Sequence, residues 1–79
     1  MEIKVLGTGC KKCQVLESQV RRVVEALDRK DINITKVENI KDIMSYNILS
    51  TPALVINEKV KVFGRIPSSD EITRWIKEI

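Results

Sequence analysis

Two regular patterns of apolar residues predict the two longer helices of the chain. From Cys10 to about Asp28 the apolar residues recur at spacings of three and four, which is typical of an amphipathic helix. A second stripe follows Ser68, and Glu71 three positions later completes a capping-box signature, so a helix is expected from Ser68 to Ile79. The apolar positions are Cys13, Leu16, Val20, Val23, Val24 and Leu27 in the first helix, and Ile72, Trp75, Ile76 and Ile79 in the last.

Four short runs rich in apolar and β-branched residues predict strands. Ala53–Ile56 is apolar throughout, as expected of a strand buried on both faces, whereas Lys59–Phe63 alternates and predicts an edge strand with one side toward solvent. Asn57 and Glu58 join these two strands as a hairpin. Because Glu58 stands where a two-residue turn prefers glycine, we expect a longer loop. The other two strands are Glu2–Leu6 and Ile32–Val37.

The order of the elements predicts an α/β fold. Asn39 is a favourable N-cap for a shorter helix whose apolar positions are Ile40, Ile43 and Met44, so the complete order is β-α-β-α-β-β-α. Helices separate the first three strands, and such connections are usually crossovers. We therefore expect a parallel first half, with the hairpin adding an antiparallel edge.

Size and composition favour one globular domain covering residues 1–79. The chain has 79 residues, of which 43% are hydrophobic and 32% charged, and this length supports a single core. No run is apolar enough for a membrane span and the N-terminus lacks a signal-peptide pattern, so we expect a cytoplasmic protein without a membrane partner. The net charge of +3 is spread among acidic residues, which argues against a nucleic-acid partner.

The candidate chemistry lies in Cys10-Lys11-Lys12-Cys13, where the first long helix begins. Cysteines three residues apart lie on the same side of a helical turn, and their separation suits a reversible disulfide. A bridge that closes so short a loop adds little stability, which favours a redox role. The helix N-terminus together with Lys11 and Lys12 favours a thiolate at Cys10, so we expect Cys10 to attack and Cys13 to resolve.

Other uses of the same two cysteines stay open at this point. The chain has no histidine and only two cysteines, which argues against zinc held within one chain but leaves a zinc ion bridging a dimer. Two thiolates also suit a soft metal such as Cu(I) or Hg(II), as in metallochaperone loops. Those ferredoxin-like modules end on a strand, whereas this chain is predicted to end on a helix. Buried structural cysteines and a redox sensor without exchange activity are the remaining alternatives.

Further motifs accompany the cysteine pair along nearly the whole chain. Gly7-Thr8-Gly9 precedes Cys10, Ser50-Thr51-Pro52 precedes the buried strand, and Gly64–Ser68 precedes the last helix. With these motifs the chain resembles the thioredoxin/glutaredoxin superfamily, and within it the small redox-active disulfide proteins of archaeal type. The resemblance implies a three-layer sandwich with a four-stranded mixed sheet, and Pro52 in a cis peptide facing the cysteines. It also implies that the Thr51 backbone pairs with an extended substrate segment.

The resemblance also implies a function. A small thiol–disulfide oxidoreductase of this kind exchanges electrons between its own cysteine pair and protein disulfides. A thioredoxin-reductase-type donor would restore the dithiol, and the protein would work as a monomer. The Cys10–Cys13 pair would be its redox group, with no further cofactor and no metal.

Overall fold

The computed structural model describes residues 1–48 and 50–78 of the chain. Its elements follow the predicted order β-α-β-α-β-β-α. They are β1 (Glu2–Leu6), α1 (Lys11–Ala26), β2 (Asn33–Val37), α2 (Ile40–Met44), β3 (Ala53–Ile56), β4 (Lys59–Phe63) and α3 (Ser69–Lys77). The α/β class, the mixed four-stranded sheet and the final helix are therefore confirmed.

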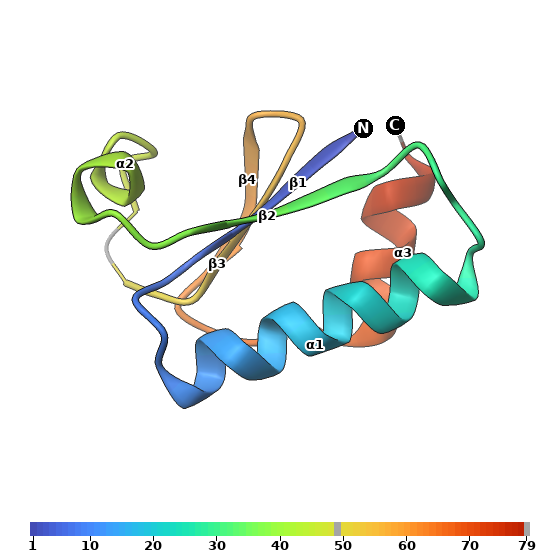
Figure 1. The fold of residues 1–79 in the computed structure, drawn as a ribbon, viewed down its shortest axis with the longest axis horizontal. Coiled ribbons are helices and arrows are strands. Elements are labelled where there is room, and N and C mark those ends of the chain that lie inside the picture. Colours follow the sequence, from blue (N-terminus) through green and yellow to red (C-terminus); the bar gives the residue numbers. More distant parts are fainter. Residues whose placement is uncertain (49, 79) are drawn as a thin grey trace.

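The four strands form one sheet in the order β2-β1-β3-β4, with β1 and β3 at its centre (Figure 1). β1 is parallel to β2, as predicted, and β3 and β4 form the predicted antiparallel hairpin. The expectation that β3 also runs parallel to β1 is wrong, because the two strands are antiparallel.

The connection through α2 returns the chain to the end of the sheet that it left. α2 itself has five residues and is about 7.5 Å long. Leu6 at the end of β1 pairs with Val37, where β2 ends, and with Ala53, where β3 begins. The chain therefore leaves the sheet and re-enters it at the same end of the strands, and the connection through α2 is not a crossover.

Helices cover the two faces of the sheet unequally. α1 and α3 lie together below the sheet in Figure 1, and α2 lies apart from them at one end. The larger core is enclosed between the sheet and the helices α1 and α3, and a smaller core on the other face includes Ile43 of α2. The larger core contains Ile3, Val5, Leu16, Val20, Val23, Ile32, Leu54, Ile56, Val62, Ile72 and Ile76, and the smaller contains Leu6, Ile43, Ala53 and Val55.

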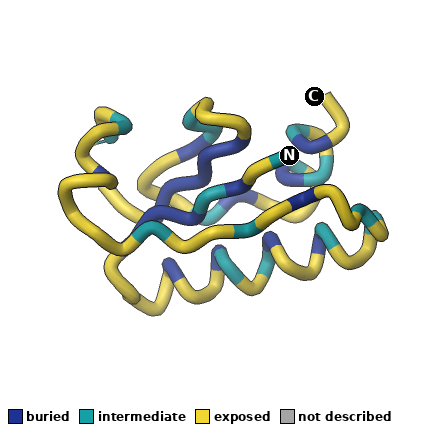
Figure 2. Tube along the Cα trace, turned by 45° about the horizontal axis from the view of Figure 1, so that its top comes forward, coloured by how far each residue is buried: buried dark blue, intermediate teal, exposed yellow. Residues whose placement is uncertain are grey.

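The two long helices bury the predicted stripes. Figure 2 shows the buried positions of α1 recurring on the side toward the strands, and they include Cys13 and Leu16. In α3, Ile72 and Ile76 are fully buried and Trp75 is partly buried, while Ile79 lies outside the described residues. No helix within residues 1–48 and 50–78 is long and apolar enough to cross a membrane.

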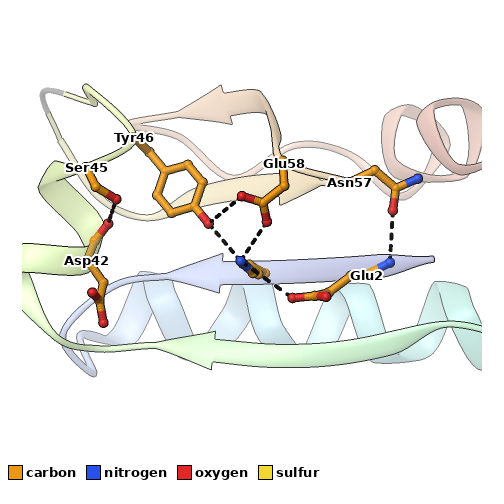
Figure 3. Close-up of polar contacts among 7 residues, drawn as sticks. Glu2, Asp42, Ser45, Tyr46, Asn57 and Glu58 are labelled. Carbon is orange, nitrogen blue, oxygen red and sulfur yellow. Dashed lines mark hydrogen bonds and ion pairs between the residues drawn. The ribbon is translucent and has the colours of Figure 1, made fainter.

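The hairpin turn contains two residues, so the expectation of a longer loop is wrong. Ile56 pairs with Lys59, and both residues between them have positive φ, 49° at Asn57 and 67° at Glu58. Glu58 adopts this conformation while its carboxylate accepts a hydrogen bond from Lys4 Nζ at 2.6 Å (Figure 3). Glu58 therefore combines a side-chain hydrogen bond with a positive-φ backbone conformation that glycine would adopt more easily.

The edge strand β4 departs from simple alternation because it contains a bulge. Leu54 pairs with Val62 and Val55 with Val60, which leaves Lys61 as the extra residue. Val62 consequently joins the larger core and Val60 packs against the smaller one. The predicted edge strand is confirmed, but its two valines face opposite sides of the sheet instead of sharing one.

Candidate redox site

The direction of β3 brings the two sequence motifs of the site together. Leu6 and Ala53 are partners in the antiparallel pair, so the turn after β1 and the residues before β3 lie at the same end of these two strands. The first segment leads to Cys10 and the second contains Thr51 and Pro52. Had β3 been parallel to β1, these motifs would have been at opposite ends of the strands.

Cys10 is the N-cap of α1. Its backbone is extended, with φ −68° and ψ 164°, and its Sγ accepts a hydrogen bond from the backbone N–H of Cys13 at 3.2 Å. Its carbonyl oxygen accepts the first backbone bond of the helix from Gln14 N at 3.0 Å. The side chain is solvent-exposed. Cys10 therefore places its sulfur at the positive end of the helix, where a solution partner can approach it.

Cys13 lies one turn further along and belongs to the buried side of the helix. Its exposed fraction is 6%, and it forms a disulfide with Cys10 across a Cα–Cα distance of 5.1 Å. That separation lies in the usual range for disulfides. The pair is asymmetric, since Cys10 is exposed and Cys13 is buried, and the interpretation of two buried structural cysteines is wrong.

Lys11 and Lys12 occupy the first turn of the same helix, and both are exposed. This turn contains no acidic residue, although acidic side chains are favoured there because of the helix dipole. Neither lysine forms an ion pair within the described part of the chain. Two uncompensated cations therefore follow Cys10 in the first turn, at a position that is unfavourable for the helix itself.

The Thr51–Pro52 peptide bond is cis, as the family resemblance implied. Pro52 is buried, and its carbonyl oxygen accepts a hydrogen bond from Gly64 N at 2.9 Å, which connects this segment to the end of β4. Thr51 is exposed, and its backbone N–H and carbonyl form no backbone hydrogen bond with residues 1–48 or 50–78. An extended peptide could therefore pair with Thr51 without displacing an existing bond.

An apolar groove adjoins the site on the side of α2. Thr8 and Thr51 line it together with α2 side chains, and its volume is about 250 Å³. Ile40 and Met44 are 63% and 66% exposed, so only Ile43 of the three predicted apolar positions is buried. The sequence contains no signal for this groove, because apolar residues at i, i+3 and i+4 share one helical face and predict burial of all three.

Gly7 is a second feature of the site that the sequence analysis did not identify. It is buried where β1 ends, and a Cβ built on it would overlap Cys13 Sγ. A glycine before a cysteine motif usually suggests backbone freedom, so its contact with a side chain six positions later gives no signal in a single sequence.

The sequence of the chain is similar to those of known proteins. A family model described as a thioredoxin domain matches residues 1–77. A thioredoxin of Methanothermobacter thermautotrophicus is 32% identical over 74 residues, which cover 94% of this chain and 95% of that protein. A thioredoxin of Methanocaldococcus jannaschii is 33% identical over 75 residues, covering 95% of this chain and 85% of that protein. The similarity therefore extends over both motifs and nearly all of both chains.

Proposed function

Since the chain belongs to the thioredoxin family and is a thiol–disulfide oxidoreductase, we propose that Cys10 is its attacking sulfur and Cys13 its resolving sulfur. The observation that carries this assignment is the asymmetry of the pair. Cys10 is exposed at the N-cap of α1, and Cys13 is only 6% exposed one turn deeper. A target disulfide can reach the first sulfur and not the second.

The proposed exchange takes place in two balanced steps. The Cys10 thiolate attacks one sulfur of the target disulfide, a Cys10–target disulfide forms, and the other target sulfur leaves and takes up a proton. Cys13 then gives up its proton and attacks Cys10 Sγ, which forms the Cys10–Cys13 disulfide and releases the second target thiol. The target gains two electrons and the chain loses two, so its own disulfide is the only redox group required.

The surroundings of Cys10 support the first step. The thiolate is the attacking species, and the helix N-terminus, the N–H of Cys13 and the cations Lys11 and Lys12 all favour it over the thiol. The N–H donates to the Cys10 sulfur in the disulfide, and the same bond strengthens when that sulfur carries a full negative charge. Lys11 and Lys12 are therefore proposed to tune the thiolate rather than to contact the reacting bond.

The target is proposed to lie across Thr51 and Pro52. The free N–H and carbonyl of Thr51 suit strand-like pairing with an extended segment, and the groove lined by Ile40 and Met44 suits an apolar side chain beside the target cysteine. Replacing Met44 and Ile40 by serine should slow reduction of a protein disulfide but not of a small aromatic disulfide. Val15→Ser is the matched control, because Val15 is 49% exposed and lies outside this groove.

Disulfide substrates and a reductase are the general partners of such a protein. We propose the finer assignment of a thioredoxin-reductase-type donor, a monomeric single-domain chain of residues 1–79 and a location in the cytoplasm. A reducing compartment fits a disulfide whose role is transient and catalytic rather than structural.

The deciding experiment measures reduction of insulin disulfides in the presence of dithiothreitol. The parent chain should accelerate precipitation of the insulin B chain and Cys10→Ser should not. Cys13→Ser, reduced and then freed of dithiothreitol, should accumulate a mixed disulfide with its target. Equal rates for the parent and Cys10→Ser would refute the roles assigned to the two sulfurs.

A further inference from the structure

Gly7 occupies a position where the backbone itself does not require glycine. The positive-φ glycines of the described chain are Gly9 and Gly64, and Gly7 is not among them. Gly7 continues the strand ladder, since its N–H donates to the Val37 carbonyl at 3.0 Å. Any residue other than proline could adopt this conformation, so the need for glycine has another cause.

The space beside Gly7 is already filled by the second cysteine. A Cβ at this position would overlap Cys13 Sγ and would lie 2.9 Å from Cys13 Cβ. Carbon atoms in contact normally lie about 3.5–4.0 Å apart, so neither approach is tolerable without movement. Thr51 Cβ, 4.0 Å away, bounds the same space on the side of the cis-proline segment.

α1 cannot easily move outward to relieve this overlap. Leu16 and Val20, the next buried positions of the helix, are both fully buried in the larger core. Raising the first turn would uncover part of that core. Rotation of the Cys13 side chain moves its sulfur away from Gly7. The Cβ–Cβ approach of 2.9 Å is the same in both redox states and needs a backbone shift of only a few tenths of an ångström.

We propose that Gly7 is a positioning residue that stabilises the disulfide state by leaving room for Cys13 Sγ. Oxidation removes two electrons and two protons from Cys10 and Cys13 and forms one S–S bond, which fixes the Cys13 sulfur beside Gly7. In the dithiol the same sulfur is free to rotate. A methyl group at position 7 therefore penalises the disulfide more than the dithiol, and the chain becomes a stronger oxidant and a weaker reductant.

The test compares Gly7→Ala with the parent in glutathione buffers, with free thiols quantified at equilibrium. We expect the oxidation equilibrium constant of Gly7→Ala to fall by at least about tenfold, which corresponds to roughly 30 mV for a two-electron couple. Gly9→Asn is the matched control, because a Cβ there meets nothing within 4 Å and asparagine tolerates positive φ. A constant within twofold of the parent value for Gly7→Ala would overturn the proposal.

A second measurement remains decisive if Gly7→Ala is poorly folded. In the reduced parent, Cys13→Ala should lower the free energy of unfolding, because it opens a cavity next to Gly7. In the reduced Gly7→Ala chain the same change should lower that free energy by less, because the sulfur has already turned away from position 7 and the methyl group fills part of the cavity. A decrease of equal size in both backgrounds would refute the steric account.

The inference rests on the proposed exchange between Cys10 and Cys13, but its failure can be distinguished from failure of that function. Thiol titration reports the equilibrium between dithiol and disulfide without any turnover of insulin. A chain that reduces insulin through Cys10 with an unchanged potential in Gly7→Ala would refute only the role of Gly7.

Discussion

Cys10 caps the helix that carries Cys13, because its sulfur accepts the Cys13 backbone N–H at 3.2 Å. One residue thereby serves two purposes, as the end of a helix and as the exposed sulfur of a redox pair. The helix dipole and the capping bond both act on the same atom. A replacement of Cys10 that keeps a hydrogen-bond acceptor should therefore keep the helix cap while it removes the redox chemistry.

Serine and alanine at position 10 should separate these two contributions. Cys10→Ser keeps an acceptor for the Cys13 N–H, whereas Cys10→Ala removes it, and loss of an N-cap costs about 1 kcal/mol. In urea unfolding of the reduced proteins, Cys10→Ala should be less stable than Cys10→Ser by about that amount. Both should be inactive toward insulin. Equal stabilities would mean that the capping bond contributes nothing.

Lys11 and Lys12 should control the pH at which Cys10 becomes reactive. Two opposite charges about 4–10 Å apart in water attract by about 0.4–1 kcal/mol, so each lysine-to-glutamine change should move the alkylation midpoint of Cys10 upward by about 0.3–0.7 pH units. The measurement is the rate of iodoacetamide reaction with the fully reduced chain between pH 5 and 10. Lys30→Gln, beyond the opposite end of α1, is the control and should leave the midpoint unchanged. A shift of similar size in Lys30→Gln would show that net charge alone is responsible.

The sequence contained enough information to locate the elements but not to orient all of them. The stripe containing Leu16 and Val20 has one stable solution, a helix packed on a sheet, and the structure confirms it. The direction of β3 depends on the end of the sheet to which the preceding connection returns, and the pattern of apolar residues does not contain that information. The bulge at Lys61 was likewise invisible, since it arises from pairing with β3 rather than from the sequence of β4.

The candidate site shows the same division between local and long-range information. The roles predicted for Cys10 and Cys13 follow from spacing and helix position and stay predictions, while the structure shows Cys10 at the helix N-cap and a disulfide between the two residues. The cis bond before Pro52 came from family resemblance, because most X-Pro bonds are trans and nothing local distinguishes this one. The restriction at Gly7 depends on a contact that exists only once α1 is docked on the sheet.

Lys4 connects the turn after α2 to the sheet and the hairpin through its ammonium group. Its Nζ donates to Glu58 Oε1 at 2.6 Å and to Tyr46 OH at 2.9 Å, and Figure 3 shows Tyr46 and Glu58 meeting there. The hydrogen bond to Glu58 is the main cause that raises the pKa of Lys4, and the same bond lowers the pKa of Glu58. Because Ile43 is the only buried residue of α2, this polar contact carries much of the attachment.

Tyr46→Phe should therefore loosen α2 locally. Loss of a hydrogen bond of ordinary strength predicts amide hydrogen exchange roughly 2- to 10-fold faster in α2. Amides of α3, which is attached through the larger core, should exchange at the parent rate and serve as the internal control. Uniform acceleration in both helices would indicate global destabilisation instead.

Glu71 supplies both the capping box of α3 and an ion pair with Arg65. Its carboxylate accepts hydrogen bonds from Arg65 at 2.8 and 3.1 Å and from the backbone N–H of Ser68 at 3.0 Å. The Arg65 guanidinium is the larger cause and the Ser68 N–H the second, and together they lower the pKa of Glu71 from 4.5 to about 2. The folded state therefore favours the ionised form of the Glu71 carboxylate.

The sign of the resulting pH dependence follows from this depressed pKa. The stabilisation is complete above the unfolded-state pKa near 4.5 and is lost as the pH falls through the folded-state value of about 2. Glu71→Gln keeps an oxygen acceptor for the Ser68 N–H but carries no charge, so it should remove this contribution. Asp31, whose pKa Arg29 also lowers, remains in both proteins, so acid destabilisation will be reduced rather than abolished.

The measurement is the urea midpoint of the oxidised parent and of Glu71→Gln between pH 2 and 6. The difference in midpoint should be constant above about pH 5 and should shrink as the pH falls toward 2, because the parent then protonates the same carboxylate. Arg65→Gln, which removes the partner and leaves the carboxylate, should show a weaker pH dependence than the parent as well. A difference that stays constant down to pH 2 would mean that the pKa of Glu71 is the same in the folded and unfolded chains, and the ion pair with Arg65 would then contribute no stability in solution.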